Sequence, residues 1–282
     1  MAITKKSDLN SLFNSIFEDA LFVARETNLM TNLVTIYNGT GYAARKVSQW
    51  ATLTAEAVTE GLDYANPQTF DKSVLATLTP GEVIGQSILT DVMVETDPED
   101  SRRTCAQELG NAMSTKIDTD LVGDFASFST DVGPGAGQAC TLAKFGVGAS
   151  ILRNAKVMNP IHAVLHPYHW HDIWVLLGQP SANQAFLGDV ANRALQDFFV
   201  GSFLNMNWFV NANISVDGSD DAISGIFNPG ALAFDSRKAP TIEPERDASL
   251  RAWELNVTAG YAHGVRRPTF GCKYTADATV PS

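Results

Sequence analysis

The sequence predicts an α+β fold, and three of its features lead to that class. Apolar residues recur every four positions between Cys105 and Phe125, which predicts one long helix. Several shorter segments alternate apolar and polar residues as half-buried strands do, most clearly after Ala248. Between residues 38 and 81 the chain is polar and rich in threonine, with few large apolar side chains. Since 45% of the 282 residues are hydrophobic, the rest of the chain can still bury a sizeable core.

Composition argues against several functional classes. A formal net charge of −11 makes the chain a poor candidate for wrapping nucleic acid, because phosphate contacts need lysine and arginine. Its cysteines, Cys105, Cys140 and Cys272, form no CxxC pair and no disulfide framework, which favours a reducing compartment. The N-terminus lacks an apolar run of signal-peptide length, and no segment is long enough to span a membrane. A secreted β-rich binding module is therefore disfavoured, and no membrane partner is expected.

Two segments near the N-terminus are predicted to need a neighbouring surface. Residues 8–30 have the pattern of an amphipathic helix, whose apolar stripe must dock on the same chain or on a neighbour. Residues 38–81 contain strand-like alternation at 42–51 and 70–78, so a long two-stranded ribbon is expected. Because an isolated ribbon is marginal in water, this ribbon should rest on another subunit.

Residues 83–95 are predicted to form a strand that leads into the long helix. Asp97 is expected to be the N-cap and Pro98 the first helical residue, since both positions favour these residue types. At 1.5 Å per residue the helix would be about 40 Å long, so it would span the molecule as a spine. The residues expected in its buried core are Leu109, Met113, Ile117 and Leu121.

The remaining segments are predicted to mix helices and strands. In chain order we expect a helix over 142–158, a strand over 162–166, a helix from Pro167, strands over 207–215 and 225–234 around the turn DGSDD, and a strand, short turn and strand within 249–275.

The segment from His162 to His171 holds four of the five histidines and raises the alternative of a metal-dependent hydrolase. On a strand, His162 and His166 would lie about 13 Å apart. The nitrogen ligands of one zinc ion lie only roughly 3.4 Å apart. On the helix that follows, His169 and His171 would point in opposite directions. The expected secondary structure therefore scatters the imidazoles, and histidines without a metal are the favoured interpretation.

Other motifs give no support for catalysis. The sequence contains no GxSxG elbow, no P-loop and no GxGxxG motif after a strand. Asp118 and Asp120 would lie on different faces of the long helix and form no catalytic pair. Asp217, Asp220 and Asp221 could hold calcium, but a solvated turn is the favoured interpretation. We therefore expect no catalytic residue, no metal ligand and no cofactor.

Several short stretches occur in a recognisable order along the chain. They are Glu60-Gly61-Leu62-Asp63, Thr90-Asp91, Lys116-Ile117-Asp118-Thr119-Asp120-Leu121, the step from Val164 to Pro167, and the closing GYAHGVRRPTFGCKYTADA. Their order and spacing resemble the major capsid proteins of tailed bacteriophages with the Hong Kong 97-like fold. In that family an extended loop leads through a strand into a long spine helix. The resemblance covers nearly the whole chain.

The resemblance implies how the chain is divided. Residues 1–37 would form an N-arm and residues 38–81 an extended β-ribbon loop, and both would lie on neighbouring subunits. Residues 82–138 and 235–282 would form a peripheral domain that contains the spine helix. Residues 139–234 would form an axial domain around the centre of each capsomer.

The resemblance also implies the function. The chain would be a structural, non-enzymatic homo-oligomer that self-assembles into hexamers and pentamers of an icosahedral phage head. The head would enclose double-stranded DNA without sequence-specific binding, in a virion assembled in the bacterial host cytoplasm. The side chains expected to contact other subunits are Leu12, Phe13, Phe17, Trp50, Glu60, Asp63 and Tyr64.

Partners and alternatives follow from the same resemblance. Scaffolding, portal and decoration proteins would be partners in such a head. The chain begins almost directly at the N-arm, which implies a separate scaffolding protein or none. Lys46 and Lys72 lie in the loop region where some relatives crosslink, but no partner asparagine can be assigned. An encapsulin-type nanocompartment shell is the alternative with the same fold, and the metal-dependent hydrolase is the alternative from another class.

Overall fold

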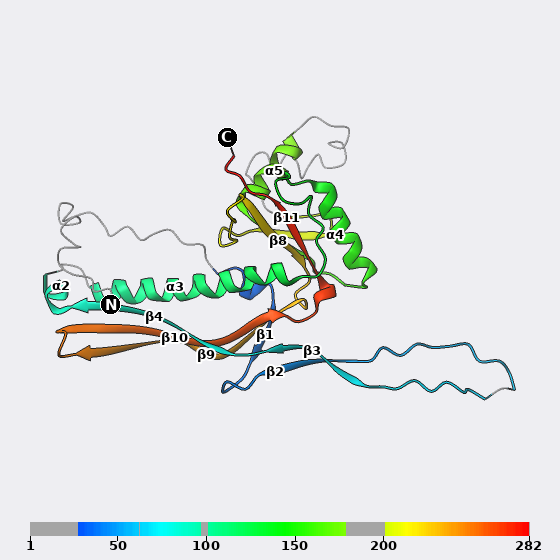
Figure 1. The fold of residues 1–282 in the computed structure, drawn as a ribbon, viewed down its shortest axis with the longest axis horizontal. Helices are drawn as coiled ribbons and strands as arrows, with labels where there is room; N and C mark the ends of the chain where they lie inside the picture. The colour runs from blue at the N-terminus through cyan, green and yellow to red at the C-terminus, as the bar shows by residue number, and fades with distance from the viewer. Residues whose placement is uncertain (1–27, 62, 97–100, 179–200, 282) are drawn as a thin grey trace.

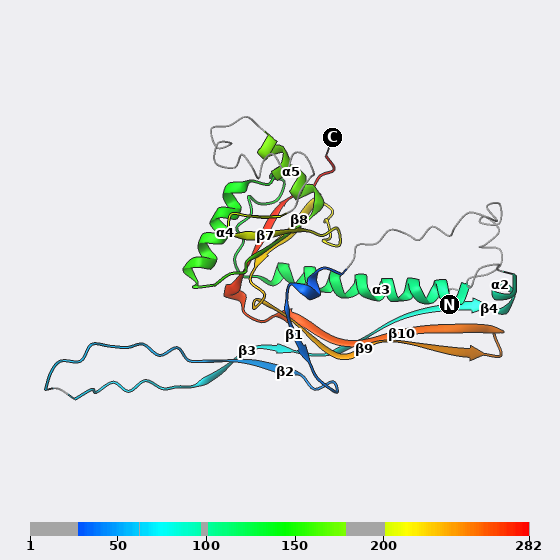
Figure 2. The same ribbon diagram turned by 180° about the vertical axis from the view of Figure 1, so that it is seen from behind.

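The computed structural model describes residues 28–61, 63–96, 101–178 and 201–281, which form an elongated molecule (Figure 1). One long helix lies along a four-stranded sheet. A five-stranded sheet with two shorter helices stands at one end of that helix, and a two-stranded ribbon projects beyond the body. The view from behind shows the same arrangement (Figure 2).

Helices and strands are mixed along the chain, as the sequence predicts. Their bounds are η2 (Met30–Asn32), β1 (Thr35–Asn38), β2 (Arg45–Trp50), β3 (Lys72–Leu78), β4 (Gly81–Thr90), α2 (Asp91–Thr96), α3 (Ser101–Gly123), η3 (Asp124–Ser127), α4 (Leu142–Asn154), β5 (His162–Leu165), α5 (Pro167–Gly178), β6 (Ser202–Phe203), β7 (Met206–Val210), β8 (Asp221–Phe227), β9 (Leu232–Asp247), β10 (Ala252–Val265), η4 (Pro268–Phe270) and β11 (Gly271–Asp277). Within the described ranges, no helix is both long enough and apolar enough to cross a membrane.

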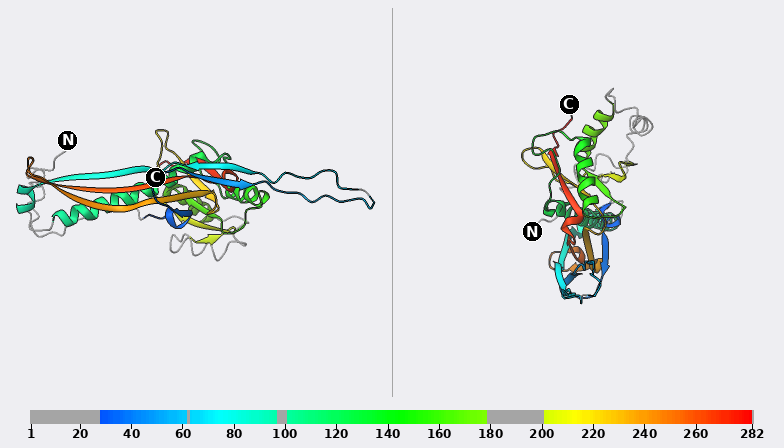
Figure 3. Two further views of the ribbon diagram at one scale, coloured as in Figure 1. Left: turned by 90° about the horizontal axis from the view of Figure 1, so that it is seen from below. Right: turned by 90° about the vertical axis from the view of Figure 1, so that its right-hand side faces the viewer.

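The four-stranded sheet has the order β1-β9-β10-β4. Strand β10 pairs antiparallel with β9 and β4, and β1 runs parallel to β9. Helix α3 packs along this sheet (Figure 3) and buries Met113, Ile117 and Leu121, with Leu109 half-buried against the same cluster. The helix has 23 residues, so it is about 35 Å long, somewhat shorter than expected. It ends at Gly123, where a 3-10 turn follows.

The five-stranded sheet has the order β11-β8-β5-β7-β6, with β5 parallel to β7 and antiparallel to β8. Trp170 of α5 packs against Trp208 with ring centroids 6.1 Å apart. Phe145 of α4 stacks on Tyr274 of β11 at 4.0 Å. Helix α4 approaches β8 so closely that a Cβ on Gly148 would lie 2.7 Å from a methyl carbon of the isoleucine beneath it. These aromatic and aliphatic contacts form a second hydrophobic core.

Several predicted strands end earlier than expected. The strand predicted over 83–95 stops at Thr90, and helix α2 follows. Thr90 starts that helix because its hydroxyl oxygen accepts the backbone N–H of Met93 at 3.4 Å, as an N-cap residue does. The strand predicted over 207–215 stops at Val210, where the chain turns toward α3.

The prediction of a single strand over 225–234 is wrong. Strand β8 ends at Phe227, a turn closed by the bond from Ala231 N–H to Asn228 O follows, and β9 then continues to Asp247. β9 contains Pro240 and Pro244, residues that are unfavourable in the interior of a sheet. β9 tolerates both prolines because β1 pairs with it only as far as Ser236, which leaves the rest as an edge strand.

The last two strands form in the expected segments, but they do not pair with each other. β10 belongs to the four-stranded sheet, whereas β11 pairs with β8 in the five-stranded sheet. The chain crosses between the sheets at η4, where a Cβ on Gly271 would lie 2.4 Å from the Phe128 ring. Residues 235–282, which were expected to share one domain, therefore contribute strands to both sheets.

Some predictions fall outside the described residues. They are the amphipathic helix up to residue 27, with Leu12, Phe13 and Phe17, and the expected helix start at Asp97 and Pro98.

Candidate assembly surfaces

The ribbon formed by β2 and β3 carries exposed aromatic side chains. The two strands pair antiparallel from Arg45 opposite Leu78 to Trp50 opposite Lys72. Trp50 and Phe70 stack across the ribbon with centroids 4.8 Å apart, and the Lys72 ammonium lies 5.6 Å from the Trp50 ring centroid. Trp50 is 54% exposed and Phe70 is 55% exposed. Exposed apolar area of this kind is typical of a surface that binds a partner.

Beyond the stack, hydrogen bonds tie the two sides of the ribbon together. The Gln68 side chain accepts the backbone N–H of Thr54 at 2.8 Å and donates to the carbonyl of the same residue. Nearer the tip, Tyr64 donates to Glu56 at 3.4 Å. The predicted contact residues Glu60 and Asp63 are exposed at this tip. Contacts within one subunit therefore hold the two sides of the ribbon together.

The base of the ribbon is anchored to the body by apolar and ionic contacts. Val47 and Leu78 are buried against alanines of β9 and β10. Arg45 and Arg237 both donate to the fully buried Asp235 carboxylate, at 2.8 Å and 2.6 Å. Burial alone would raise the pKa of Asp235, but hydrogen bonds from the two guanidinium groups outweigh it and hold the pKa below its usual value. The ribbon therefore leaves the body in a fixed direction.

Asp118 joins three parts of the molecule, and the sequence analysis missed this role. One of its carboxylate oxygens accepts the backbone N–H groups of Leu29 and Met30 at 2.9 and 2.8 Å. The other accepts the side-chain amides of Asn211 and Asn213 at 2.5 and 2.8 Å. The carboxylate is fully buried on α3. It therefore links the N-terminal segment, the spine helix and the segment after β7.

A signal for Asp118 was present in the helical spacing. Val122 and Phe125 follow it at intervals of four and three residues, which places Asp118 on the buried face of the helix. A carboxylate at such a position must find hydrogen-bond donors, because an unpaired buried charge is strongly unfavourable. The comparison of Asp118 with Asp120 alone overlooked this.

The end of α3 is tied to β10 by two further contacts. Tyr261 donates to Asp120 at 2.7 Å, and the His263 ring lies 3.0 Å from the Asp124 carboxylate. The hydrogen bond to Asp124 raises the pKa of His263 above its usual value, and this effect exceeds the opposing effect of burial. The spine helix and the sheet beneath it are therefore held by polar as well as apolar contacts.

The histidines of the segment 162–171 are mostly packing residues. His162, His166 and His169 are buried, and His171 is half-buried beside Trp174. The His169 ring bonds Ser224 Oγ at 2.7 Å and the Ala276 carbonyl at 3.2 Å. Burial and the proximity of His169 lower the pKa of His166 to about 4. Among the residues with a described position, no group of three or more His, Cys, Asp or Glu side chains is arranged to hold a metal ion.

The acidic turn after β7 is shaped by its own hydrogen bonds. One oxygen of Asp217 accepts the backbone N–H groups of Ser219 and Asp221 at 2.8 and 3.0 Å. Asp221 in turn accepts the N–H of Gly137 at 2.7 Å. Asp220 has a positive φ of 61°, which aspartate tolerates in turns. Backbone N–H groups therefore already supply hydrogen bonds to the carboxylates of Asp217 and Asp221.

Comparisons with known proteins agree with this architecture. A chain of mycobacterium phage Che8 superposes with a TM-score of 0.73 at 17% identity, covering 92% of this chain and 95% of that one. The capsid structure of cyanophage P-SCSP1u gives 0.75 at 11% identity, covering 93% and 92%. The head structure of Helicobacter pylori bacteriophage KHP40 gives 0.71 at 11% identity, covering 93% and 94%. A search by sequence among curated proteins gives no match.

A sequence profile of the family described as phage capsid protein matches residues 88–274, which is more than half of the chain. The chain therefore belongs to the phage capsid protein family. It has the Hong Kong 97-like fold, and it is a major capsid protein that forms the shell of a tailed-phage head.

Proposed function

We propose that this capsid protein assembles into hexameric and pentameric rings, which close an icosahedral head around double-stranded DNA. The five-stranded sheet with α4 and α5 would form the axial domain at the centre of each ring. The four-stranded sheet with α3 would form the peripheral domain between rings. Since β11 pairs with β8, the final strand is assigned to the axial domain.

The exposed aromatic stack on the ribbon carries this proposal. Trp50 and Phe70 leave more than half of their surfaces open to solvent, and Val74 beside them is 55% exposed. The ribbon extends away from its own body, so its own subunit does not cover this row and a neighbouring copy would (Figure 1). Trp50, with Glu60, Asp63 and Tyr64 nearer the tip, would contact the neighbouring subunit. Many such contacts, each modest, give a shell its stability through multivalency.

The role is structural and not enzymatic. His162, His166 and His169 are buried, and the described residues contain no group of three His, Cys, Asp or Glu side chains arranged for a metal, which argues against a metal-dependent hydrolase. The net charge of −11 favours enclosing the genome without gripping it. We propose that the shell assembles in the bacterial host cytoplasm, with scaffolding, portal and decoration proteins as its partners and Leu12, Phe13 and Phe17 of the N-arm contacting a neighbour.

Electron microscopy of the recombinant protein tests this proposal. The double variant Trp50→Ser, Phe70→Ser should fold but yield few particles, and deletion of residues 52–66 should do the same. The matched control is Val280→Ser, because Val280 is 68% exposed and lies two residues from the C-terminus, which Figure 1 shows far from the ribbon. Particle yield is measured by sedimentation and negative-stain images. Normal yield from the ribbon variants would contradict an intersubunit role for the ribbon.

A further inference from the structure

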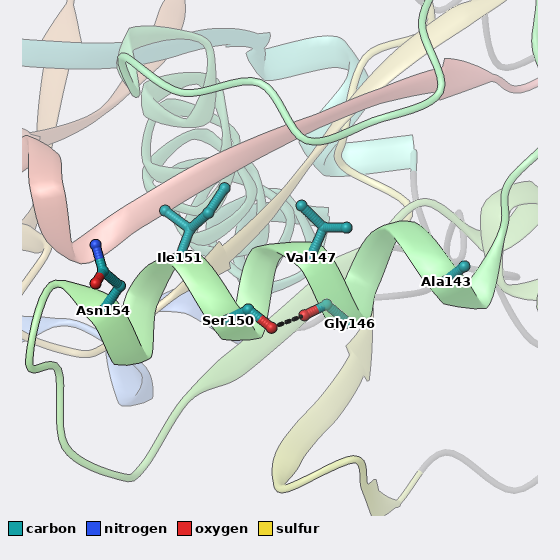
Figure 4. Close-up of a pocket in the computed structure, with 6 residues that line it drawn as sticks. All are labelled: Ala143, Gly146, Val147, Ser150, Ile151 and Asn154. Carbon is teal, nitrogen blue, oxygen red and sulfur yellow. Dashed lines mark hydrogen bonds between the residues drawn. The ribbon is translucent and has the colours of Figure 1, made fainter.

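Helix α4 has a shallow open hollow of about 650 Å³ on its outer face. Figure 4 shows its lining, which consists of Ala143, Gly146, Val147, Ser150, Ile151 and Asn154. The opposite face of the helix, with Phe145, Gly148 and Leu152, is buried against the sheet. Most of the lining is therefore on the solvent side of the helix, and only Ile151 also packs against the core of its own subunit.

The hollow suits an apolar occupant. Val147 is 47% exposed within it. The hydroxyl of Ser150 already donates to the Gly146 carbonyl at 2.9 Å, so it does not need a partner from outside (Figure 4). Small side chains on either side let another chain approach the helix closely.

The segment that carries the hollow is basic, although the chain as a whole is acidic. No aspartate or glutamate occurs between Asp131 and Asp172. The exposed charges of this segment are Lys144, Arg153 and Lys156. A partner with an apolar residue flanked by carboxylates would therefore complement the helix in both shape and charge.

The turn before β8, residues 216–221, combines an apolar residue with carboxylates. No lysine or arginine occurs between Arg193 and Arg237. Val216 is 37% exposed, and Asp217 and Asp220 are exposed beside it. The hydrogen bonds from Ser219 and Asp221 to Asp217 fix the shape of the turn. A preformed turn loses little conformational entropy when it binds.

The turn and the hollow lie toward opposite sides of the five-stranded sheet. Helix α4 covers the Ile226 end of β8, as the contact with Gly148 shows. The turn adjoins Asp221, at the other end of the same strand. Figures 1 and 2 show α4 on one side of this sheet and the start of β8 toward the other. A hollow on one subunit would therefore meet the turn of a second copy and not its own.

We propose that the turn Val216–Asp221 of one subunit inserts into the α4 hollow of the next, with Val216 in the hollow and Asp217 and Asp220 facing Lys144 and Arg153. The inference rests on the proposed function, since it requires rings of identical subunits. A contact between two different surfaces repeats head to tail, and it closes into a ring when the rotation between neighbours brings the last subunit back to the first. It would therefore fix the order of subunits around each capsomer.

Charge reversal tests the contact. The reversed helix carries Lys144→Glu and Arg153→Glu. The reversed turn carries Asp217→Asn, Ser219→Lys and Asp220→Asn, since asparagine keeps the acceptor oxygen at 217 and tolerates the positive φ at 220. Each variant alone should lower particle yield by at least about tenfold, because like charges facing each other across an interface are strongly unfavourable. A chain that carries both sets should recover most of the yield.

Mixing the two single variants gives a sharper result. In an equal mixture, every contact can be complementary only if the two variants alternate around the ring. Alternation is satisfied in a ring of six, but a ring of five always contains one mismatched pair. The mixture should therefore form six-membered rings in sheets or tubes, with few closed heads.

The outcomes are distinguishable from failure of the proposed function. If unmodified protein forms no particles under any condition, the shell itself is in question. If it forms heads, then normal yield from either single variant overturns the turn-in-hollow contact. A failure of the combined chain to recover, with native circular dichroism, also overturns it. If a reversal variant misfolds, Lys144→Gln with Arg153→Gln replaces the reversed helix, and an unchanged yield from that pair counts against the contact.

Discussion

At the scale of single residues, Asp118 links the N-terminal segment, the spine helix and the segment after β7. Four donors from two distant segments converge on its buried carboxylate. Buried polar groups that lose their partner are costly, whereas the net gain from a satisfied pair is modest. The contribution of Asp118 is therefore mainly that its donors are not left unpaired.

Replacing Asp118 tests this directly. Asp118→Ala leaves two backbone N–H groups and two side-chain amides without their acceptor, so the free energy of unfolding should fall by roughly 3 kcal/mol. Thr119→Ala, at the neighbouring exposed position, should change it by less than about 0.5 kcal/mol. Denaturant unfolding of dissociated subunits followed by circular dichroism measures both. Equal stability of the two variants would rule out the proposed junction.

The His263–Asp124 pair predicts one pH dependence. The raised pKa of His263 means that the folded state favours the charged imidazole, so the pair stabilises fully below about pH 6.5. Its contribution is lost as pH rises through the raised pKa. His263→Gln should therefore cost up to about 1 kcal/mol at pH 6 and almost nothing at pH 9. Thermal unfolding at both pH values checks this, and an equal cost at both would contradict it.

His166 predicts the opposite dependence. Its pKa of about 4 means that the folded state favours the neutral ring. Stability is then present above about pH 6.5 and is lost as pH falls toward 4, because the unfolded chain binds the proton first. His166→Asn should flatten the loss of stability between pH 6.5 and 4.5. His171→Asn serves as the control, since His171 is half-buried on the next helix. An unchanged acid limb in the His166 variant would argue that other groups dominate.

At the scale of elements, the spine helix depends on the apolar side of α3. Ile117 is buried between the helix and the four-stranded sheet. Ile117→Asp would place an unpaired charge there, and the expected cost of roughly 3–5 kcal/mol should abolish soluble subunit. Asn111→Asp on the exposed face of the same helix should leave the yield unchanged. Soluble Ile117→Asp protein with a native circular dichroism spectrum would contradict this packing.

Elements with a clear local period were predictable, and those determined by distant contacts were not. The repeat from Cys105 to Phe125 identified α3, and alternation identified β2, β3 and β10. The length of strand β9 was not predicted, because its two prolines are acceptable only at a sheet edge, and the local sequence does not show which strand lies at an edge. The separation of β10 from β11 depends on the close approach of Gly271 to Phe128, a contact with no periodic signal.

The candidate assembly surfaces also include a part that was predictable from the sequence and a part that was not. The ribbon was predictable, because a long polar segment without a core needs a partner surface. The exposures of Trp50 and Tyr64 are consistent with that role, but their contacts on a neighbour stay a prediction. The hydrogen-bond partners of Asp118 could not be predicted, because the asparagines after β7 lie more than ninety residues away in the sequence.

At the scale of the whole molecule, net charge should make the shell sensitive to salt. Subunits with a charge of −11 repel one another, and the screening length grows from about 8 Å at physiological salt to about 30 Å at 0.01 M. Heads should therefore dissociate at a lower temperature in dilute buffer than in 0.5 M NaCl. Close ion pairs within an interface are screened less and should persist. Light scattering during heating measures this, with sucrose as an uncharged control. Identical curves at both salt concentrations would contradict it.

The aromatic stack of Trp50 and Phe70 forms between the two sides of one ribbon, so it exists before any two copies meet. Every newly made subunit thus exposes the Trp50–Phe70 stack in a form that needs no conformational change before it binds a neighbour. The rate of shell growth would then depend on the concentration of free subunits relative to the number of partly assembled shells. Overproduction beyond what those nuclei can absorb should give malformed clusters instead of more heads.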